Sequence, residues 1–205
     1  MIYATQLRLG LKDIVSRKLT DAYSIHRIIY SLFEDNRDEK AKSSCMRSGF
    51  VFCELEPSPT FRNFLILSNR SPRALDLYDG SLKTKMVPES FLEANVYRFT
   101  VWINPTKRNN ETKNLQVIDK DEIASWFKEK SEKAWGFTTE YATLDKLEVD
   151  KFSGKNRRPI TIARAKISGK LYVKDRDLFK KSFTDGIGRG HAFGCGLLQI
   201  VPLFN

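Results

Sequence analysis

The chain has 205 residues, and its 35 Lys and Arg side chains against 25 Asp and Glu side chains give a formal charge of +10 at pH 7. Hydrophobic residues make up 41% of the chain, which excludes a disordered basic tail, because such a tail lacks the apolar surface needed to order it. A chain of this length can bury about 70% of the surface it exposes when unfolded, so it suits one large domain or two small ones. The charge indicates a polyanionic partner: RNA, DNA or an anionic membrane.

The number and spacing of the cysteines, and the N-terminal segment, indicate the cellular compartment of the protein. Cys45, Cys53 and Cys195 form no CxxC pair, and His26 and His191 are the only histidines. This set does not fit a zinc site and is typical of free thiols in a reducing cytosol, so we expect neither metal nor cofactor. The sequence has no apolar stretch long enough for a signal peptide or a membrane span. We therefore expect a cytoplasmic protein with no membrane association.

The first elements of the chain are a strand and an amphipathic helix. Residues 2–9 alternate apolar and polar side chains, as a half-buried strand does. After a polar stretch, Thr20 or Asp21 can cap a helix, because a side-chain oxygen there accepts a backbone N–H that has no partner inside the helix. The helix is predicted over residues 22–33, with its isoleucines on one apolar face.

Three strands and a short helix complete the first half. Residues 49–56 and 62–69 surround a proline-containing turn and predict a hairpin. A short helix is expected from Ser71 through Tyr78, and residues 81–87 are the final strand.

The second half begins with the same kinds of element. Residues 95–103 predict a strand, and residues 105–114 a charged loop. Asp119 or Asp121 then caps a helix over residues 122–135, whose apolar side chains recur at helical spacing.

Two strands, a helix and a closing strand follow. Residues 137–149 and 160–173 predict strands around a basic loop, residues 176–183 a short helix, and residues 194–203 a buried closing strand.

The element order is therefore βαββαβ twice over, which is the ferredoxin-like arrangement. We expect an α+β protein of two tandem ferredoxin-like domains, the first over residues 1–90 and the second over residues 91–205. The two halves share element order but no sequence repeat.

The positive charge is concentrated in one part of the chain. Residues 151–190 hold 12 Lys and Arg against 3 Asp, which is +9, whereas residues 119–150 hold 5 cations against 9 acids, which is −4. This concentration predicts a surface that follows phosphates. The loop FSGKNRRP (152–159) fits a flexible basic segment that could enter a groove, although such a loop can also be merely solvated.

A glycine-rich segment precedes the last strand. Five glycines lie between Gly186 and Gly196, and glycine lets backbone N–H groups approach a ligand closely. With Arg189 beside them, phosphate is the natural ligand. The alternative is that the glycines only shape a tight turn from helix to strand.

Tyr23 and His26 lie three residues apart on the first predicted helix and so share a face, with Arg27 beside them. The apolar residues of this helix lie elsewhere, so we expect His26 to face a cleft or water. RNA is cleaved when its 2′-OH loses a proton and attacks the adjacent phosphate, which requires a base, an acid and nearby cations but no metal. A histidine suits either proton role, and a tyrosine can position the nucleophile or share the proton transfer.

The ending GIGRGHAFGCGLLQIVPL resembles the glycine-rich C-terminal signature of the CasE-type endoribonucleases, which process CRISPR RNA for the type I-E Cascade complex. The helix segment YSIHRIIYSLF, the SGFVF strand and the basic hairpin also fit, so the resemblance covers essentially the whole chain. It implies two ferredoxin-like domains. It also implies metal-independent cleavage of the CRISPR repeat RNA at the 3′ base of its stem-loop, with a 2′,3′-cyclic phosphate or its opened form and a 5′-OH as product ends.

The resemblance also implies roles for particular residues. The catalytic histidine falls on His26, its companion tyrosine on Tyr23, and the RNA-gripping hairpin on Lys155, Arg157 and Arg158. Together with the glycine-rich segment, the candidate RNA-binding residues are Arg27, Lys155, Arg157, Arg158, Gly186, Gly188, Arg189, Gly190 and His191. His191 departs from the family, which tends to have lysine there, and it can contact phosphate or take part in proton transfer. The expected partners are the repeat stem-loop and other Cascade subunits, and we expect a monomer when free.

Two alternatives remain open at this point. The segment RSGFVFCEL (47–55) partly resembles the RNP1 pattern of RRM domains, which would make the chain a non-catalytic RNA-binding subunit of a ribonucleoprotein. Phe50 and Phe52, however, also suit core positions on alternate residues of a strand. In the other alternative, the basic hairpin serves only the assembly of such a particle.

Overall fold

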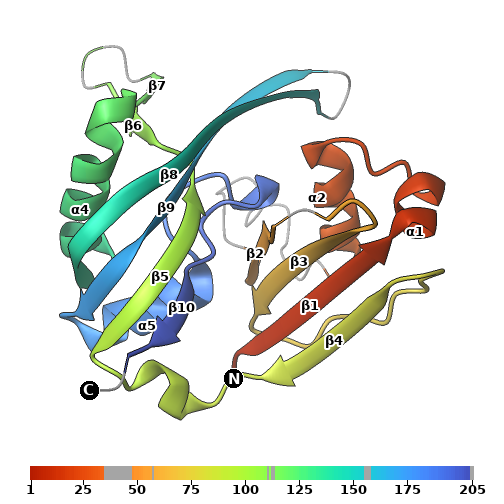
Figure 1. The fold of residues 1–205 in the computed structure, drawn as a ribbon, viewed down its shortest axis with the longest axis horizontal. Helices are drawn as coiled ribbons and strands as arrows, with labels where there is room; N and C mark the ends of the chain where they lie inside the picture. The colour runs from red at the N-terminus through yellow and green to blue at the C-terminus, as the bar shows by residue number, and fades with distance from the viewer. Residues whose placement is uncertain (35–47, 57, 110, 112–113, 155–157, 204–205) are drawn as a thin grey trace.

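The computed structural model describes residues 1–34, 48–56, 58–109, 111, 114–154 and 158–203. Two four-stranded antiparallel sheets lie side by side, and helices cover one face of each (Figure 1). The first sheet has the order β2-β3-β1-β4 and comprises β1 (Tyr3–Gly10), β2 (Phe50–Glu54), β3 (Phe61–Ser68) and β4 (Ser81–Met86). The second has the order β10-β5-β9-β8 and comprises β5 (Val96–Ile103), β8 (Phe137–Ser153), β9 (Pro159–Val173) and β10 (Gln199–Pro202). This strand order in both sheets confirms the tandem ferredoxin-like fold.

Four α-helices accompany the sheets in the described residues. They are α1 (Leu11–Ser16), α2 (Ala22–Ser31), α4 (Ile123–Ala134) and α5 (Arg176–Asp185). The first sheet takes its strands from residues 3–86 and the second from residues 96–202. A domain boundary at residue 90 therefore stays a prediction that falls between the last strand of one sheet and the first strand of the other.

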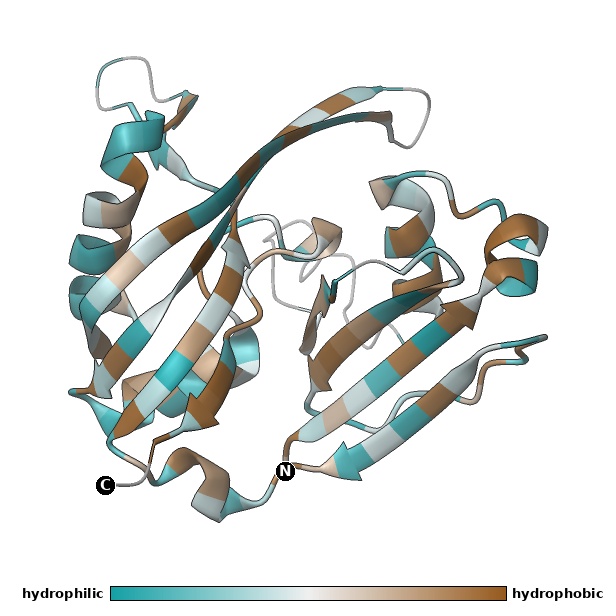
Figure 2. Cartoon of the chain, in the orientation of Figure 1, coloured by the Kyte–Doolittle hydropathy of each residue, from teal (hydrophilic) through white to brown (hydrophobic). Residues whose placement is uncertain are grey.

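Strand β2 shows why the two halves pack as one body. Its alternate residues are buried against different neighbours: Phe50 and Phe52 pack with α2, whereas Val51 and Cys53 join the core of the second half. Strands with alternating apolar and polar residues are visible in Figure 2, but β2 is apolar from Phe50 to Cys53 because both of its faces are covered there. Phe50 and Phe52 are 7% and 2% exposed, so these rings cannot stack on bases as an RNP1 motif requires.

The short helix expected from Ser71 through Tyr78 is absent, and this prediction was wrong. Leu75 and Leu77 both pack on the core of the first half, which an extended segment achieves at a spacing of two. The backbone N–H groups of Tyr78 and Asp79 donate to the buried carboxylate of Asp13 at 3.0 and 3.2 Å. These bonds to a distant side chain replace the hydrogen bonds that a helix would make.

Three further expectations need correction. The segment predicted as the charged loop 105–114 contains β6 (Thr106–Arg108), which pairs with β7 (Leu115–Val117). Helix α4 begins after the 3₁₀ turn η2 (Lys120–Glu122), and no side chain caps either one, so neither Asp119 nor Asp121 has the expected role. The closing strand is also shorter than predicted, since only Gln199–Pro202 pairs with β5.

Candidate active site

Helix α2 carries the predicted catalytic pair and begins with a well-formed cap. The Asp21 carboxylate accepts the Ser24 N–H at 2.7 Å, and the Ser24 hydroxyl accepts the Asp21 N–H at 3.1 Å. This capping box fixes the first turn, where Tyr23 lies. Ile25 and Ile29 are buried beneath the helix, and His26 is half-buried on another side of it.

His26 lies among aromatic rings. Its ring stacks on Tyr23 with centroids 5.9 Å apart, and it contacts Tyr30, one turn further along α2, at 4.0 Å. A third ring, Phe193, approaches from the other half of the chain at 5.9 Å. The predicted Tyr23–His26 pair is therefore brought together.

The Nδ1 atom of His26 is held by the backbone of the glycine-rich loop, residues 186–196. It lies 3.1 Å from the carbonyl oxygen of Ala192, which can only accept, so neutral His26 carries its proton on Nδ1. Nε2 is then the nitrogen available to accept a proton. Burial lowers the pKa of His26 below its ordinary value, and the hydrogen bond to Ala192 partly offsets this effect. The neutral ring is thus favoured at pH 7, as a general base requires.

Glycine conformations in the loop make this contact possible. The 3₁₀ turn η4 (His191–Phe193) is bounded by Gly190 and Gly194, both with φ of 80° and ψ of 19°. This left-handed conformation is costly for residues with a Cβ, so the two glycines allow η4 to fold back toward α2. The loop also lies between the sheets, where the Gly196 N–H donates to the Trp102 carbonyl at 2.7 Å.

His191 lies inside the loop. Its Nε2 is 3.2 Å from the carbonyl oxygen of Ile187. The ring is also so close to Gly196 that a Cβ there would lie 2.5 Å from the imidazole. These contacts give His191 a role in the shape of the loop, and a contact with RNA phosphate stays a prediction.

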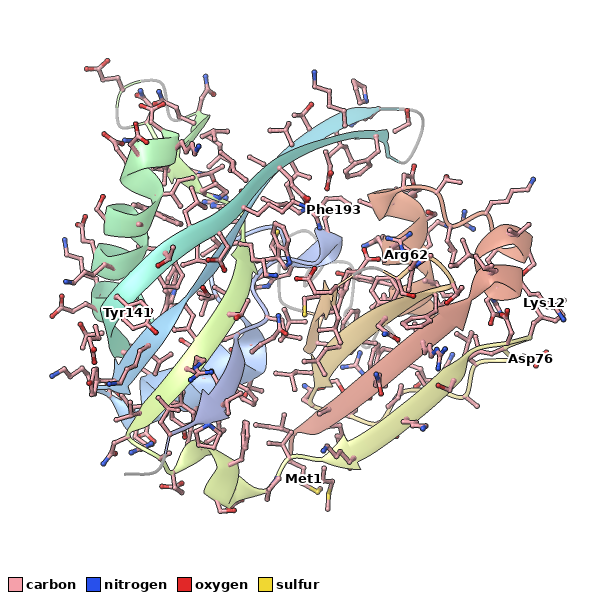
Figure 3. The ribbon with its side chains drawn as sticks, in the orientation of Figure 1. Met1, Lys12, Arg62, Asp76, Tyr141 and Phe193 are labelled. Atoms are coloured by element: carbon pink, nitrogen blue, oxygen red, sulfur yellow. The ribbon has the colours of Figure 1, made fainter. Side chains whose placement is uncertain are left out.

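The β8–β9 hairpin extends from the second sheet toward α2 (Figure 1). A cleft of about 340 Å³ lies between the hairpin and the first half, lined by Asp21, Arg62, Lys151, Phe152 and Phe193 among others. Phe193 and Arg62 are both labelled in Figure 3, where Phe193 lies beneath the hairpin, between the sheets. Phe193 lines the cleft and also contacts His26, so the cleft lies next to the candidate catalytic histidine.

Ion pairs neutralise most of the charge along the cleft. Arg62 forms two hydrogen bonds to Glu54, at 2.6 and 2.7 Å. Arg164 pairs with Glu148 and Asp150, each at 2.9 Å.

Other cations of the basic stretch are similarly engaged. Lys166, Lys170, Lys180 and Lys181 pair with Glu56, Glu140, Glu93 and Asp185. Many cations of the +9 segment are therefore engaged within the protein, and fewer of them than the sequence indicates are left for the predicted phosphate-binding surface.

The hairpin end retains basic side chains. Lys151 and Arg158 are exposed and have no ion pair among the described residues. The Gly154 N–H donates to the Arg158 carbonyl at 2.8 Å, which closes the hairpin. Lys155 and Arg157 lie outside the described residues.

The structure does not bring all candidate RNA-binding residues to one place. Arg27 is exposed on α2, next to His26 in sequence. Arg189 lines a different cavity of about 350 Å³, with Lys130, Lys181 and Trp126. Gly186 and Gly188 line that cavity too, whereas Gly190 directly precedes η4.

In the part of the chain that the structure describes, no three His, Cys, Asp or Glu side chains are placed to hold a metal ion. No helix formed by those residues combines the length and apolar character that a membrane span requires.

A family model described as "CRISPR associated protein" matches residues 2–202. The chain belongs to this family. The match extends over both halves, as did the sequence resemblance. None of the curated protein sequences matches the chain.

Solved structures show how widely this CRISPR-associated fold is shared. The CRISPR endoribonuclease Cse3 bound to a 19-nucleotide RNA is 19% identical, with a TM-score of 0.79 and coverage of 98% of this chain and 99% of that one. Thermus thermophilus Cse3, bound to an RNA that represents a pre-cleavage complex, gives a TM-score of 0.76 at 19% identity, with the same coverage. Cas6e from Escherichia coli K-12 gives 0.62 at 19% identity over 99% of this chain and 100% of that one. At these identities the likeness establishes the fold.

Sequence analysis missed three parts of the site in this CRISPR-associated protein: the Ala192 carbonyl, Phe193 and Phe152. A backbone carbonyl has no sequence signature, and a single phenylalanine is more often a core residue. The only signal was the glycine pair at 190 and 194, which marks a turn but not what the turn touches.

Proposed function

We propose that the protein is a metal-independent endoribonuclease that binds the stem-loop of CRISPR repeat RNA and cleaves at the 3′ base of the stem. The observation that carries this proposal is the arrangement of His26, whose Nδ1 is held by the Ala192 carbonyl beside Tyr23. The fold shared with RNA-bound Cse3 supports RNA as the substrate.

In the proposed reaction the 2′-oxygen attacks the adjacent phosphorus and the bond from phosphorus to the 5′-oxygen breaks. Neutral His26 accepts the 2′-OH proton at Nε2, for which its lowered pKa suits it. Tyr23, stacked on the imidazole, positions the nucleophile or shares the proton transfer. The leaving 5′-oxygen takes up a proton, so the products carry a 2′,3′-cyclic phosphate and a 5′-OH.

Binding falls to the end of the β8–β9 hairpin. We assign contact with the stem to Lys155, Arg157 and Arg158, as the resemblance implies, and add Lys151. Of the described cations of this segment, Lys151 and Arg158 are exposed without an ion pair, whereas others such as Arg164 and Lys170 pair with carboxylates. A-form RNA is recognised largely through shape and phosphate contacts, which a basic hairpin can supply. Similar chains occur in a CRISPR RNA-guided surveillance complex, which supports assembly with other Cascade subunits.

The direct experiment incubates the purified protein with repeat stem-loop RNA in EDTA and analyses the product ends. We expect one cut at the 3′ base of the stem, with a cyclic phosphate and a 5′-OH. The same RNA with a 2′-deoxy residue at the cut site should bind but remain intact. Binding of the all-ribose RNA without any cleavage would favour the non-catalytic RNA-binding subunit, and loss of cleavage in EDTA would contradict metal independence.

A further inference from the structure

We propose that Phe193 is a positioning residue for His26 and that Phe152, at the base of the hairpin end, holds Phe193 in place. The hairpin that grips the RNA and the histidine that cuts it are then fixed to each other through two aromatic contacts. This inference rests on the proposed role of His26 in cleavage.

The contacts form a continuous path across the two halves of the chain. The ring of Phe152 on β8 meets that of Phe193 edge-on, with centroids 5.0 Å apart and planes inclined at 62°. The Phe193 ring in turn lies 5.9 Å from the His26 imidazole at 44°. Tilted and edge-to-face geometries at these distances are favourable for aromatic pairs.

The same short turn contacts His26 in two ways. Within η4, Ala192 supplies the carbonyl for Nδ1 and Phe193 supplies the ring beside the imidazole. The hydrogen bond directs one nitrogen, while the ring restricts how the imidazole can tilt. The Phe193 N–H donates to the Gly190 carbonyl at 2.9 Å, so ring and carbonyl belong to one rigid turn.

Neither phenylalanine is an ordinary core residue. Both are half-buried, and neither belongs to the two apolar clusters formed by the described residues. Both instead line the cleft between α2 and the hairpin. The position of these two rings at the edge of a cleft is better explained by their contacts with each other and with His26 than by packing in a core.

The test compares Phe193→Ala and Phe152→Ala with the wild type and with Phe193→Tyr, which keeps the ring. Phe91→Ala is the control, since Phe91 packs on Phe183, away from His26. Three quantities are measured: the single-turnover cleavage rate, the Kd for stem-loop RNA blocked by a 2′-deoxy residue, and the His26 pKa by NMR. With only two histidines in the chain, the His26 signal is assigned by substitution of His191.

Titratable and charged groups near His26 also influence its pKa. In the described residues, Tyr23 and Tyr30 contact the imidazole from its own helix. The charged side chains that line the adjoining cleft are Asp21, Glu54, Arg62, Asp150, Lys151 and Arg164. The Phe193→Ala change leaves all of these in the chain and removes only the ring.

For Phe193→Ala we expect the cleavage rate to fall by about ten- to a hundredfold, because small displacements of a catalytic group cost rate on this scale. The Kd should change by less than about threefold, and the His26 pKa should rise toward its ordinary value as water gains access. Phe152→Ala should cause a smaller loss of the same kind, and Phe193→Tyr should recover most of the rate. Phe91→Ala should lower the thermal unfolding temperature without moving the His26 pKa.

An unchanged rate in Phe193→Ala would overturn the inference, as would a rate loss with an unchanged His26 pKa. If Phe193→Ala does not fold, Phe193→Leu tests the same point, because it keeps apolar bulk without a ring. Failure of the proposed function looks different: His26→Ala would then cleave at the wild-type rate.

Discussion

The Nδ1 atom of His26 and the backbone carbonyl oxygen of Ala192 lie 3.1 Å apart, although the two residues are 166 positions apart in the sequence. The histidine belongs to the first half of the chain and the carbonyl to the glycine-rich loop of the second. The candidate site is therefore completed only when both halves are folded and packed together.

The stability of the protein should depend on the protonation of His26. Burial lowers its pKa below 6.5 in the folded state, so the unfolded chain binds a proton more readily. The free energy of unfolding should then decrease as the pH falls below about 6.5, until the folded-state pKa is passed. In urea unfolding at about pH 7 and about pH 5, His26→Asn should lose less stability than the wild type. An equal or greater loss in the variant would contradict this assignment.

Removal of the α2 cap should destabilise the helix that carries Tyr23 and His26. Asp21→Ala deletes the acceptor for the Ser24 N–H and should lower the free energy of unfolding by about 1 kcal/mol. Asp119→Ala is the matched control, since Asp119 precedes η2 without capping it through its side chain. Denaturant unfolding measures both, and equal losses in the two variants would mean that the capping box has no effect of its own.

The cations at the end of the β8–β9 hairpin should dominate RNA affinity. The double variant Arg157→Ala/Arg158→Ala should weaken stem-loop binding and reduce the slope of log K against log salt by about one per lost phosphate contact. The matched pair is Lys166→Ala/Lys170→Ala, with the same charge change on the same hairpin, but at lysines already paired with Glu56 and Glu140. This pair should leave the salt slope nearly unchanged. Similar slopes for both double variants would show that charge alone, without position, determines binding.

The fold was largely predictable because hydrophobic periodicity determines where strands and helices lie. Prediction from the sequence failed where a tertiary contact determines the local backbone conformation. Ser71 and Pro72 are suited to begin a short helix, but the bonds from Tyr78 and Asp79 to Asp13 keep the segment extended. Asp13 is more than 60 residues away, so no local pattern could reveal it.

The site was predictable where one helix determines geometry and unpredictable where separate elements meet. Tyr23 and His26 share a helix face by spacing alone, whereas Phe193 reaches His26 through the fold. The net charges counted along the sequence were also a poor guide, because they do not show which charges pair in the fold. Acidic β8 pairs with basic β9, and Glu148 opposite Arg164 cancels charges that were counted in separate segments of the sequence.

The central claim is that His26 carries out the proton transfer that cleaves repeat RNA. The most direct measurement is the single-turnover cleavage rate of stem-loop RNA by wild type and by His26→Ala, with affinity measured in parallel on the 2′-deoxy RNA. We predict that His26→Ala abolishes cleavage and binds the stem-loop with nearly wild-type affinity. Cleavage by His26→Ala at the wild-type rate would contradict the account.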